Sequence, residues 1–452
     1  MVTRLSDSHQ YEHLWSTGDL AAVFEERARL QSWLAIIAAL ARAQARLGII
    51  PVASADAITA HCDVDRLDLD LVAEQTRVTS HSTLGLIRAL QQLLPEGARE
   101  HVYYGTTVQD VTDTWFALVM RTVGAGVWQD VRALESDLLN LAERHRETPM
   151  AGRTHGQPGS PITFGFKVAS WADELRRHLD RLREGRPRWL VGQLGGAVGV
   201  LGFFEPDGLA LRREFCTELG LGEPSFSWLT ARDRVAEFGT VLAMLCTTLA
   251  RIGNEVYELA RPEIGELREP TTADAVGSIT MPHKCNPESS EHLDTLARLA
   301  RANAAVLVEG MAGGHERDGR SWKAEWIALP EVCLLTGVAL RTARTLAGGL
   351  EVDRGAMRHN LARFGDQADS ERLLAGLSAR IGKHRAQQRL HELMVAGRSG
   401  DLGAALVAAG DATEDDIRRW THGSAVSTAI AMTDQLVRHS RAARVIEPER
   451  WS

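Results

Sequence analysis

A continuous apolar seam is the feature that most restricts the fold of this chain. Between residues 235 and 259 apolar side chains recur at alternating steps of three and four, at Val235, Phe238, Leu242, Leu245, Leu249, Ile252, Val256 and Leu259. A helix with this spacing presents one apolar stripe that needs partner helices lying nearly parallel to it. Less regular seams run through residues 131–141 and 293–307, and alternating β patterns are scarce. The sequence therefore predicts an all-α fold, an elongated subunit with a central bundle of long helices.

Loops rich in Gly, Thr and Pro divide the predicted helices into three regions. We expect an N-terminal helical lobe over residues 1–110, a central long-helix bundle over 111–350 and a C-terminal helical lobe over 351–452. A chain of 452 residues is long enough for such a body with a lobe at each end.

Charge and composition exclude several classes of partner. A formal net charge of −8 gives no global attraction for nucleic acid or an anionic membrane. We find no run of eighteen apolar residues and no secretory signal pattern, so we expect no membrane span. The five cysteines are scattered without a CxxC pair or a metal-ligand cluster, which predicts unpaired thiols in a cytoplasmic protein that needs neither metal nor organic cofactor.

The most informative loop covers residues 277–287. It reads Gly-Ser-Ile-Thr-Met-Pro-His-Lys-Cys-Asn-Pro, and Glu291 follows it. The glycine, the two prolines and the hydroxyls predict an irregular segment between helices. Lys284 and Asn286 lie two residues apart and could both face an anion, whereas a solvated surface turn is the plainer interpretation of the same residues.

This loop closely resembles the signature of the fumarase/aspartase superfamily of lyases, Gly-Ser-Ser-x-Met-Pro-x-Lys-x-Asn-Pro-x-x-x-Glu, and departs from it only at Ile279. Residues 152–158, Gly-Arg-Thr-His-Gly-Gln-Pro, resemble the corresponding block of adenylosuccinate lyase and its relatives. Residues 105–114 resemble their Gly-x-Thr-Ser-x-Asp-Val-x-Asp-Thr block after a one-residue shift. The resemblance implies an all-α homotetramer whose central helices form a twenty-helix bundle and whose active sites combine segments of three subunits.

The resemblance also implies roles for individual residues. Ser278 matches the catalytic base of the family, and His155 is the expected general acid. The residues expected to bind substrate are Thr106, Thr107, Lys284, Asn286, His81, Arg153 and Gln157. Glu291 matches the carboxylate that supports His155 in the family, although a solvated carboxylate at a helix start is an equally simple interpretation. For His81 a structural role also remains open, because the Asp that follows this histidine in adenylosuccinate lyases is Ser82 here.

These residue types suit the family reaction, an anti β-elimination next to a carboxylate. Removal of a weakly acidic proton leaves a carbanion whose charge spreads onto the carboxylate, and positioned donors stabilise that charge. Lys284 and Asn286 would supply such donors, while Thr106 and Thr107 would hold a substrate carboxylate. Ser278 acts as a base only if backbone N–H groups and a nearby lysine stabilise its oxyanion in a loop that closes over the substrate.

Departures from the family patterns bear on the substrate. In residues 315–326, Lys323 and Trp326 replace the Ser and Arg with which adenylosuccinate lyases hold a nucleotide phosphate, and a tryptophan cannot make the bidentate grip of a guanidinium. The Trp322 to Trp326 stretch instead resembles 3-carboxy-cis,cis-muconate cycloisomerase. In that enzyme, however, an Arg usually stands where this chain has Cys285.

The sequence therefore predicts a lyase that releases fumarate from a small substituted succinate of the amino, N-substituted or nitro type. Cycloisomerase-type lactonisation is the close alternative. Adenylosuccinate lyase activity and a non-catalytic, crystallin-like relative are less favoured.

Overall fold

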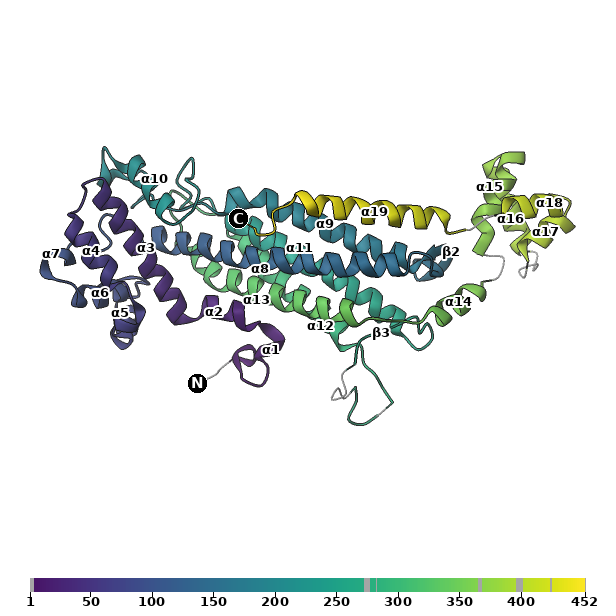
Figure 1. The fold of residues 1–452 in the computed structure, drawn as a ribbon, viewed down its shortest axis with the longest axis horizontal. Helices are drawn as coiled ribbons and strands as arrows, with labels where there is room; N and C mark the ends of the chain where they lie inside the picture. The colour runs from purple at the N-terminus through teal and green to yellow at the C-terminus, as the bar shows by residue number, and fades with distance from the viewer. Residues whose placement is uncertain are drawn as a thin grey trace.

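The protein is an elongated, almost entirely helical body (Figure 1). The computed structural model describes residues 4–271, 277–281, 283–364, 368–395, 401–422 and 425–451. Its strands form two small antiparallel pairs, β1 (Pro149–Thr154) with β2 (Gln157–Thr163) and β3 (Leu267–Arg268) with β4 (Glu351–Val352). The predicted all-α class is confirmed.

The N-terminal lobe is a group of short helices around one longer helix. Its members are α1 (Glu12–Trp15), α2 (Gly18–Phe24), α3 (Glu26–Arg46), α4 (Val52–His61), α5 (Leu69–Thr79), α6 (Leu84–Leu93) and α7 (Glu96–Arg99). A later helix, α10 (Gly208–Glu218), packs against α3, so that this end of the molecule is built from two distant parts of the sequence (Figure 1).

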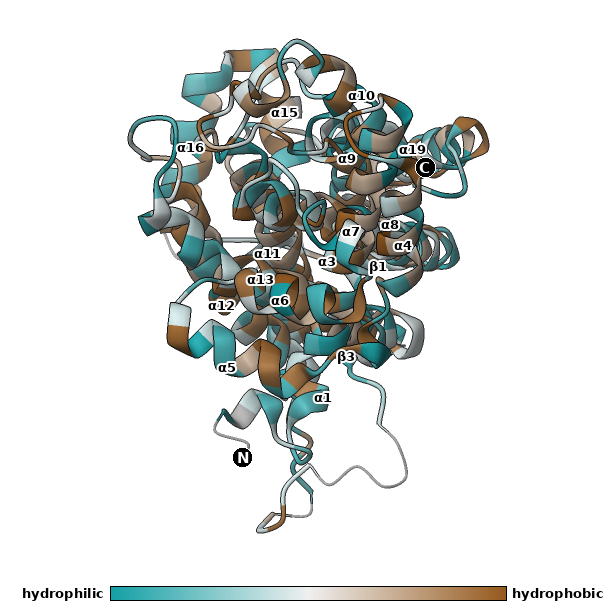
Figure 2. Cartoon of the chain, turned by 90° about the vertical axis from the view of Figure 1, so that its left-hand side faces the viewer, coloured by the Kyte–Doolittle hydropathy of each residue, from teal (hydrophilic) through white to brown (hydrophobic). Residues whose placement is uncertain are grey.

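Long helices form the central bundle. They are α8 (Val108–Arg144), α9 (Phe164–Trp189), α11 (Asp233–Ala260), α12 (Glu288–Glu309) and α13 (Gly319–Gly349). All eight residues of the predicted seam in α11 are buried, and the weaker seams of α8 and α12 are buried as well. Figure 2 looks along the bundle, in which α8 packs against α9 and α13, and α11 packs against the same two helices. The predicted bundle of long helices is confirmed.

Two of these helices are apolar enough to cross a membrane by length and composition alone. The most apolar windows of α11 and α13 have mean hydropathies of 1.5 and 1.3. In the bundle, 67% and 61% of those windows are buried against other helices. Core helices of soluble bundles have the same composition, so we interpret both as core elements.

The C-terminal part of the chain leaves the bundle and then returns to it. The lobe consists of α14 (Arg354–Ala362), α15 (Ser370–Ile381), α16 (Lys383–Val395), α17 (Leu402–Ala408) and α18 (Glu414–Trp420), and α15 to α18 share a small apolar core. The last helix, α19 (Ser427–Ile446), lies along α9 and α8 (Figure 1). The sequence predicted one C-terminal helical lobe over residues 351–452 and gave no sign that its last helix returns to the bundle.

Trp451 fixes the end of the returning segment. Its indole Nε1 donates to the carbonyl oxygen of Leu182 at 3.1 Å, and its ring fills the space beside Gly124. The residue is buried, so the end of the described chain is part of the bundle core rather than a frayed tail.

The five cysteines are free, as predicted. Cys216, Cys246 and Cys333 are buried in the core, Cys62 is half-buried and Cys285 is exposed.

Candidate active site

The sequence-predicted site residues fall into three groups within one chain. His81, Thr106 and Thr107 lie at the N-terminal end of α8; Arg153, His155 and Gln157 lie in the β1–β2 hairpin; Ser278, Lys284, Asn286 and Glu291 lie between β3 and the start of α12. The first two groups flank α8, whose 37 residues span about 55 Å at the rise of an α-helix. One chain therefore cannot bring Thr107 and His155 to the same substrate.

The N-terminal end of α8 is capped by side chains of its own first turn. Thr107 is the N-cap and forms a capping box with Asp110, whose carboxylate accepts from the Thr107 N–H at 2.9 Å. The hydroxyl of Thr106 donates to the carbonyl oxygen of Tyr103 at 3.1 Å, which fixes the turn before the helix. The positive end of the helix dipole favours an anion at such a terminus.

Gly105 allows this turn to form. Its φ is +75°, and a Cβ at this position would lie 2.3 Å from the ring of Phe204. Only glycine combines this conformation with so close an approach.

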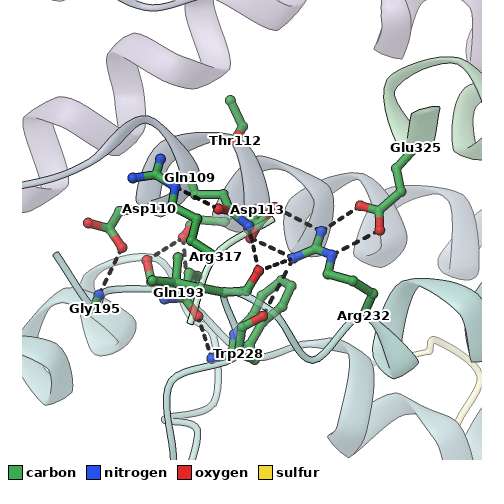
Figure 3. A network of polar contacts seen from close by, with 12 residues as sticks. Gln109, Asp110, Thr112, Asp113, Gln193, Gly195, Trp228, Arg232, Arg317 and Glu325 are labelled. Carbon is green, nitrogen blue, oxygen red and sulfur yellow. Dashed lines mark hydrogen bonds and ion pairs between the residues drawn. The ribbon is translucent and has the colours of Figure 1, made fainter. Parts of the chain in front are cut away.

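Asp110 ties a second loop to the same end of α8. Its two carboxylate oxygens accept backbone N–H bonds from Gly195 at 2.8 Å and from Gly196 at 3.1 Å (Figure 3). Complete burial raises the pKa of Asp110 to about 7, against the three N–H bonds that favour the carboxylate. The glycine-rich loop and the Thr106–Thr107 turn are therefore held by one side chain.

A buried ion-pair network lies beneath this end of the helix (Figure 3). The guanidinium of Arg232 donates to both oxygens of Asp113, at 2.8 and 3.0 Å, and to both oxygens of Glu325 on α13. All three side chains are at most 3% exposed. Burial is the main influence on both acids and raises their pKa, while the arginine opposes the shift. The network fixes α8, α11 and α13 relative to one another.

Arg317 reaches the same region from the loop before α13. Its Nε donates to the side-chain oxygen of Gln109 at 3.1 Å, and Gln109 in turn donates to Asp113 at 3.1 Å. The block of residues 315–326, which bears on the substrate, therefore lies beside the Thr106–Thr107 turn.

His81 is close to this group through one intermediate residue. The N–H of Thr83 donates to His81 Nδ1 at 3.4 Å, and the Thr83 hydroxyl donates to the phenol oxygen of Tyr103 at 3.5 Å. Tyr103 contacts Thr83 through its phenol oxygen and Thr106 through its carbonyl oxygen, so His81 lies in the same region as the Thr106–Thr107 turn without a direct contact among the described residues.

No role for Asp110, Asp113 or Gln109 was predicted from the sequence, although all three lie within the 105–114 block. The available signal was two acids three residues apart in the first turns of a predicted helix, with Arg232 downstream. Charged residues in such a position are rarely buried without a partner.

His155 lies at the tip of the β1–β2 hairpin. Thr154 pairs with Gln157, so the loop has two residues, and both His155 and Gly156 have positive φ, at 54° and 72°. A turn of this kind matches the twist of the two strands and points its side chains outward. His155 and Gln157 are exposed.

Arg153, two residues before His155, does not face solvent. Its guanidinium makes a bidentate ion pair with the fully buried carboxylate of Glu266, at 2.9 and 2.6 Å. The sequence analysis assigned Arg153 to substrate binding, whereas this geometry favours a structural or positioning role.

The signature loop projects from the side of the bundle between β3 and α12 (Figure 1). Its described residues are 277–281 and 283–287. The Ser278 hydroxyl oxygen accepts from the N–H of Met281 at 3.0 Å, and the Asn286 amide donates to the carbonyl oxygen of Gly277 at 2.9 Å. The second bond closes the loop at its base, and Lys284 is exposed.

Glu291 lies in the first turn of α12 and is exposed. Among the contacts of the described residues, none joins it to His155 within this chain. A hollow of about 950 Å³ opens beside the loop, and its lining includes Arg268, Cys285, Asn286 and Arg354. No three His, Cys, Asp or Glu side chains of the described residues gather in a way that could hold a metal ion.

The chain matches the lyase family model over residues 16–301, which is more than half of its length. The chain belongs to the fumarase/aspartase superfamily of lyases. It is an enzyme of the lyase type, and the resemblance of the signature loop is confirmed.

Three proteins similar to this chain are named for three different reactions. It is 38% identical over 396 residues to N-acetyl-S-(2-succino)cysteine lyase of Dickeya dadantii, covering 88% of this chain and 87% of the relative. It is 39% identical over 385 residues to 3-carboxy-cis,cis-muconate cycloisomerase of Pseudomonas aeruginosa, covering 84% of both. It is 38% identical over 404 residues to nitrosuccinate lyase of Streptomyces davaonensis, again covering 84% of both.

A solved structure supports the same fold. The 3-carboxy-cis,cis-muconate lactonizing enzyme of Pseudomonas putida is 32% identical to this chain with a TM-score of 0.86, and the match covers 96% of this chain and 100% of that one.

Proposed function

We propose that the protein releases fumarate from a small 2-substituted succinate by anti β-elimination, with a heteroatom leaving group such as an amine, nitrite or thiolate. The observation that carries the proposal is the signature loop, in which Ser278, Lys284 and Asn286 match the superfamily motif and Asn286 closes the loop by donating to the carbonyl oxygen of Gly277. A serine oxyanion and a lysine in one loop suit proton removal next to a carboxylate, which every substrate of this class carries. Two of the similar relatives are named for substituted succinates, which agrees with the proposal.

In the proposed reaction, Ser278 Oγ takes a proton from the CH₂ carbon of the succinate. The electrons of the broken C–H bond pass first onto the adjacent carboxylate, where Lys284 stabilises the charge. They then form the C=C bond while the leaving group departs from the neighbouring carbon with its own electron pair. His155 gives a proton to the leaving group, so that the products are fumarate and the protonated leaving group.

The proposal requires several copies of the chain, because α8 separates Thr107 from His155 by about 55 Å. We propose a homotetramer in a cytoplasmic location, with sites completed by neighbouring subunits. Exposed apolar side chains on the bundle helices support an interface between copies: Met244, Tyr257, Leu299, Val306, Val308 and Ile327. Patches of this kind mark association surfaces.

Mixing two inactive variants tests this assembly. We expect His155→Gln and Ser278→Ala proteins, each nearly inactive toward an N-aryl aspartate, to regain a fraction of wild-type activity on that substrate after co-expression, because some sites then receive both wild-type residues from different chains. Sedimentation of the wild-type protein should give the mass of four chains. Monomeric sedimentation, or a lack of any regained activity in mixed tetramers, would contradict shared sites.

The need for His155 is expected to depend on the leaving group. A thioether substituent leaves as a thiolate of moderate basicity, whereas an N-aryl aspartate nitrogen would leave as a strongly basic anion unless it is protonated. His155→Gln should therefore lower kcat by about 10² to 10⁴-fold for the N-aryl aspartate and by less than about tenfold for the thioether. Equal losses for both leaving groups, measured as fumarate absorbance under saturating substrate, would show that His155 is not the acid.

The experiment that tests the function is a substrate panel. It contains N-acetyl-S-(2-succino)cysteine, nitrosuccinate, aspartate, N-substituted aspartates and 3-carboxy-cis,cis-muconate, with fumarate measured as the product. We expect fumarate from at least one substituted succinate. Consumption of the carboxymuconate without any fumarate would overturn the proposal.

That last outcome corresponds to a second candidate function, cycloisomerase-type lactonisation. It is favoured by Trp322 and Trp326, which pack edge to face with their ring centroids 4.8 Å apart in the stretch that resembles the cycloisomerases. Exposed Cys285, in place of their arginine, favours the less charged succinates.

A further inference from the structure

A buried polar cluster joins the hairpin of His155 to two other parts of the chain. At its centre is Glu266, the residue before β3, whose side chain is 0% exposed. Arg153 of β1 forms two hydrogen bonds to it, at 2.9 and 2.6 Å. Asn360 of α14 donates to the same carboxylate at 2.9 Å and to the carbonyl oxygen of Ile264 at 2.8 Å. The Glu266 carboxylate thus accepts hydrogen bonds from both the hairpin and the C-terminal lobe.

The backbone around Glu266 is held as firmly as its side chain. Its N–H donates to the carbonyl oxygen of Leu259 at the end of α11, at 2.9 Å, and its carbonyl oxygen accepts from the N–H of Asp353 at 3.0 Å. The pairing of β3 with β4 follows immediately. Glu266 is therefore fixed to the bundle before it contacts the hairpin.

The same short segment is also the base of the signature loop. Glu269, three residues later, accepts from the N–H groups of Ser289 and Ser290 at 3.0 and 2.8 Å and from the Ser290 hydroxyl at 2.5 Å. These bonds fix the point at which the chain enters α12 after the loop. Segment 266–269 thus binds the β1–β2 hairpin through Glu266. It binds the start of α12, where the signature loop ends, through Glu269.

A second contact joins the hairpin to the lobe. The Ser160 hydroxyl of β2 donates to the Glu371 carboxylate of α15 at 2.5 Å. The C-terminal lobe therefore touches both strands of the hairpin, because α14 packs on β1.

We infer that Glu266, with Arg153 and Asn360, is a positioning residue that sets the hairpin carrying His155, and that the C-terminal lobe serves catalysis by bracing this hairpin. The inference rests on the proposed function of His155. A bidentate guanidinium–carboxylate pair defines both distance and orientation, which a lysine or a single hydrogen bond does not. A displacement of a catalytic group by about 1 Å can cost about a hundredfold in rate.

The test is a double-mutant cycle between Glu266→Gln and His155→Gln. In the wild-type background we expect Glu266→Gln to lower kcat by about a hundredfold with little change in KM. In the His155→Gln background it should lower kcat by less than about threefold, since a residue that acts through His155 has nothing left to position. Asn360→Ala, which leaves the Arg153 pair intact, should lower kcat by about tenfold in the wild-type background alone.

Three further measurements distinguish a positioning role of Glu266 from a general loss of structure. Asp294→Asn removes an exposed ion pair on α12 and should leave kcat unchanged. Arg153→Lys should recover little of the activity lost in Arg153→Gln. If Glu266→Gln does not fold, the cycle with Asn360→Ala gives the answer.

Losses that multiply in the double variants would overturn the inference, because they would show a role independent of His155. Full activity of His155→Gln would overturn it as well. The cycle is run on the panel substrate on which His155→Gln loses most activity, and the loss in Glu266→Gln should not exceed the loss in His155→Gln on that substrate. A failure of the fumarate proposal appears separately, in the wild-type product.

Discussion

Replacing Ser278 by alanine is expected to lower kcat by about 10³-fold, within the 10² to 10⁴-fold range of general-base catalysis, while KM changes little. The oxyanion of Ser278 is the only group of the proposed mechanism that takes the proton from carbon, and the methyl group of alanine cannot do so. The loss should be the same for every leaving group, in contrast to His155→Gln. Steady-state kinetics on the best panel substrate measures it.

Thr280→Ala is the matched control for this prediction, because it removes a second hydroxyl from the same loop, at an exposed position. Ser278→Ala also loses a turn hydrogen bond to Met281, so equilibrium binding of fumarate should be measured to show that the loop still closes. Activity within threefold of wild type in Ser278→Ala would refute the assignment of the base.

Replacing Arg232 by methionine is expected to cost about 3–5 kcal/mol of folding free energy, the largest effect on stability that we foresee. The change leaves Asp113 and Glu325 buried side by side without their shared cation. An apparent melting temperature lower by about 3–5 °C should result for a chain of this size. Arg298→Met is the control, because its ion pair with Asp294 is exposed and contributes little to stability.

The stability difference between Arg232→Met and wild type should also grow with pH. Burial raises the pKa of Asp113 and of Glu325, and without Arg232 that shift is opposed only at Asp113, by Gln109 and Arg317. A carboxyl with a raised pKa in the folded state costs nothing below its unfolded pKa of about 4 and destabilises the fold as the pH rises above it. Melting curves at about pH 5 and about pH 8 measure the difference, and an equal loss at both would show that the two acids do not carry the effect.

The fold was largely predictable because its main determinant is local. The seam from Val235 to Leu259 defines the buried face of α11 without reference to any distant residue, and every member is buried. The return of α19 to the bundle was not predictable in this way. Its contact with α9 depends on pairings such as Trp451 with Leu182, which are 269 residues apart and leave no periodic signal.

In the candidate site, too, the local motifs were predictable from the sequence and the long-range contacts were not. The loop of Ser278 and the block of His155 could be recognised because each is a short continuous motif. The role of Arg153 could not, because its partner Glu266 lies 113 residues away and the motif alone equally suits a substrate-binding arginine. Likewise, the distance between Thr107 and His155 follows only from the uninterrupted length of α8.

The return of the chain to the bundle has a consequence for synthesis. Helices α8 and α9 emerge from the ribosome early, but the surface that α19 covers stays open until residues 427–451 are translated. Apolar surface exposed during that interval favours aggregation, because nascent domains fold from the N-terminus onwards. A chain truncated before Trp451 would therefore have an incomplete core.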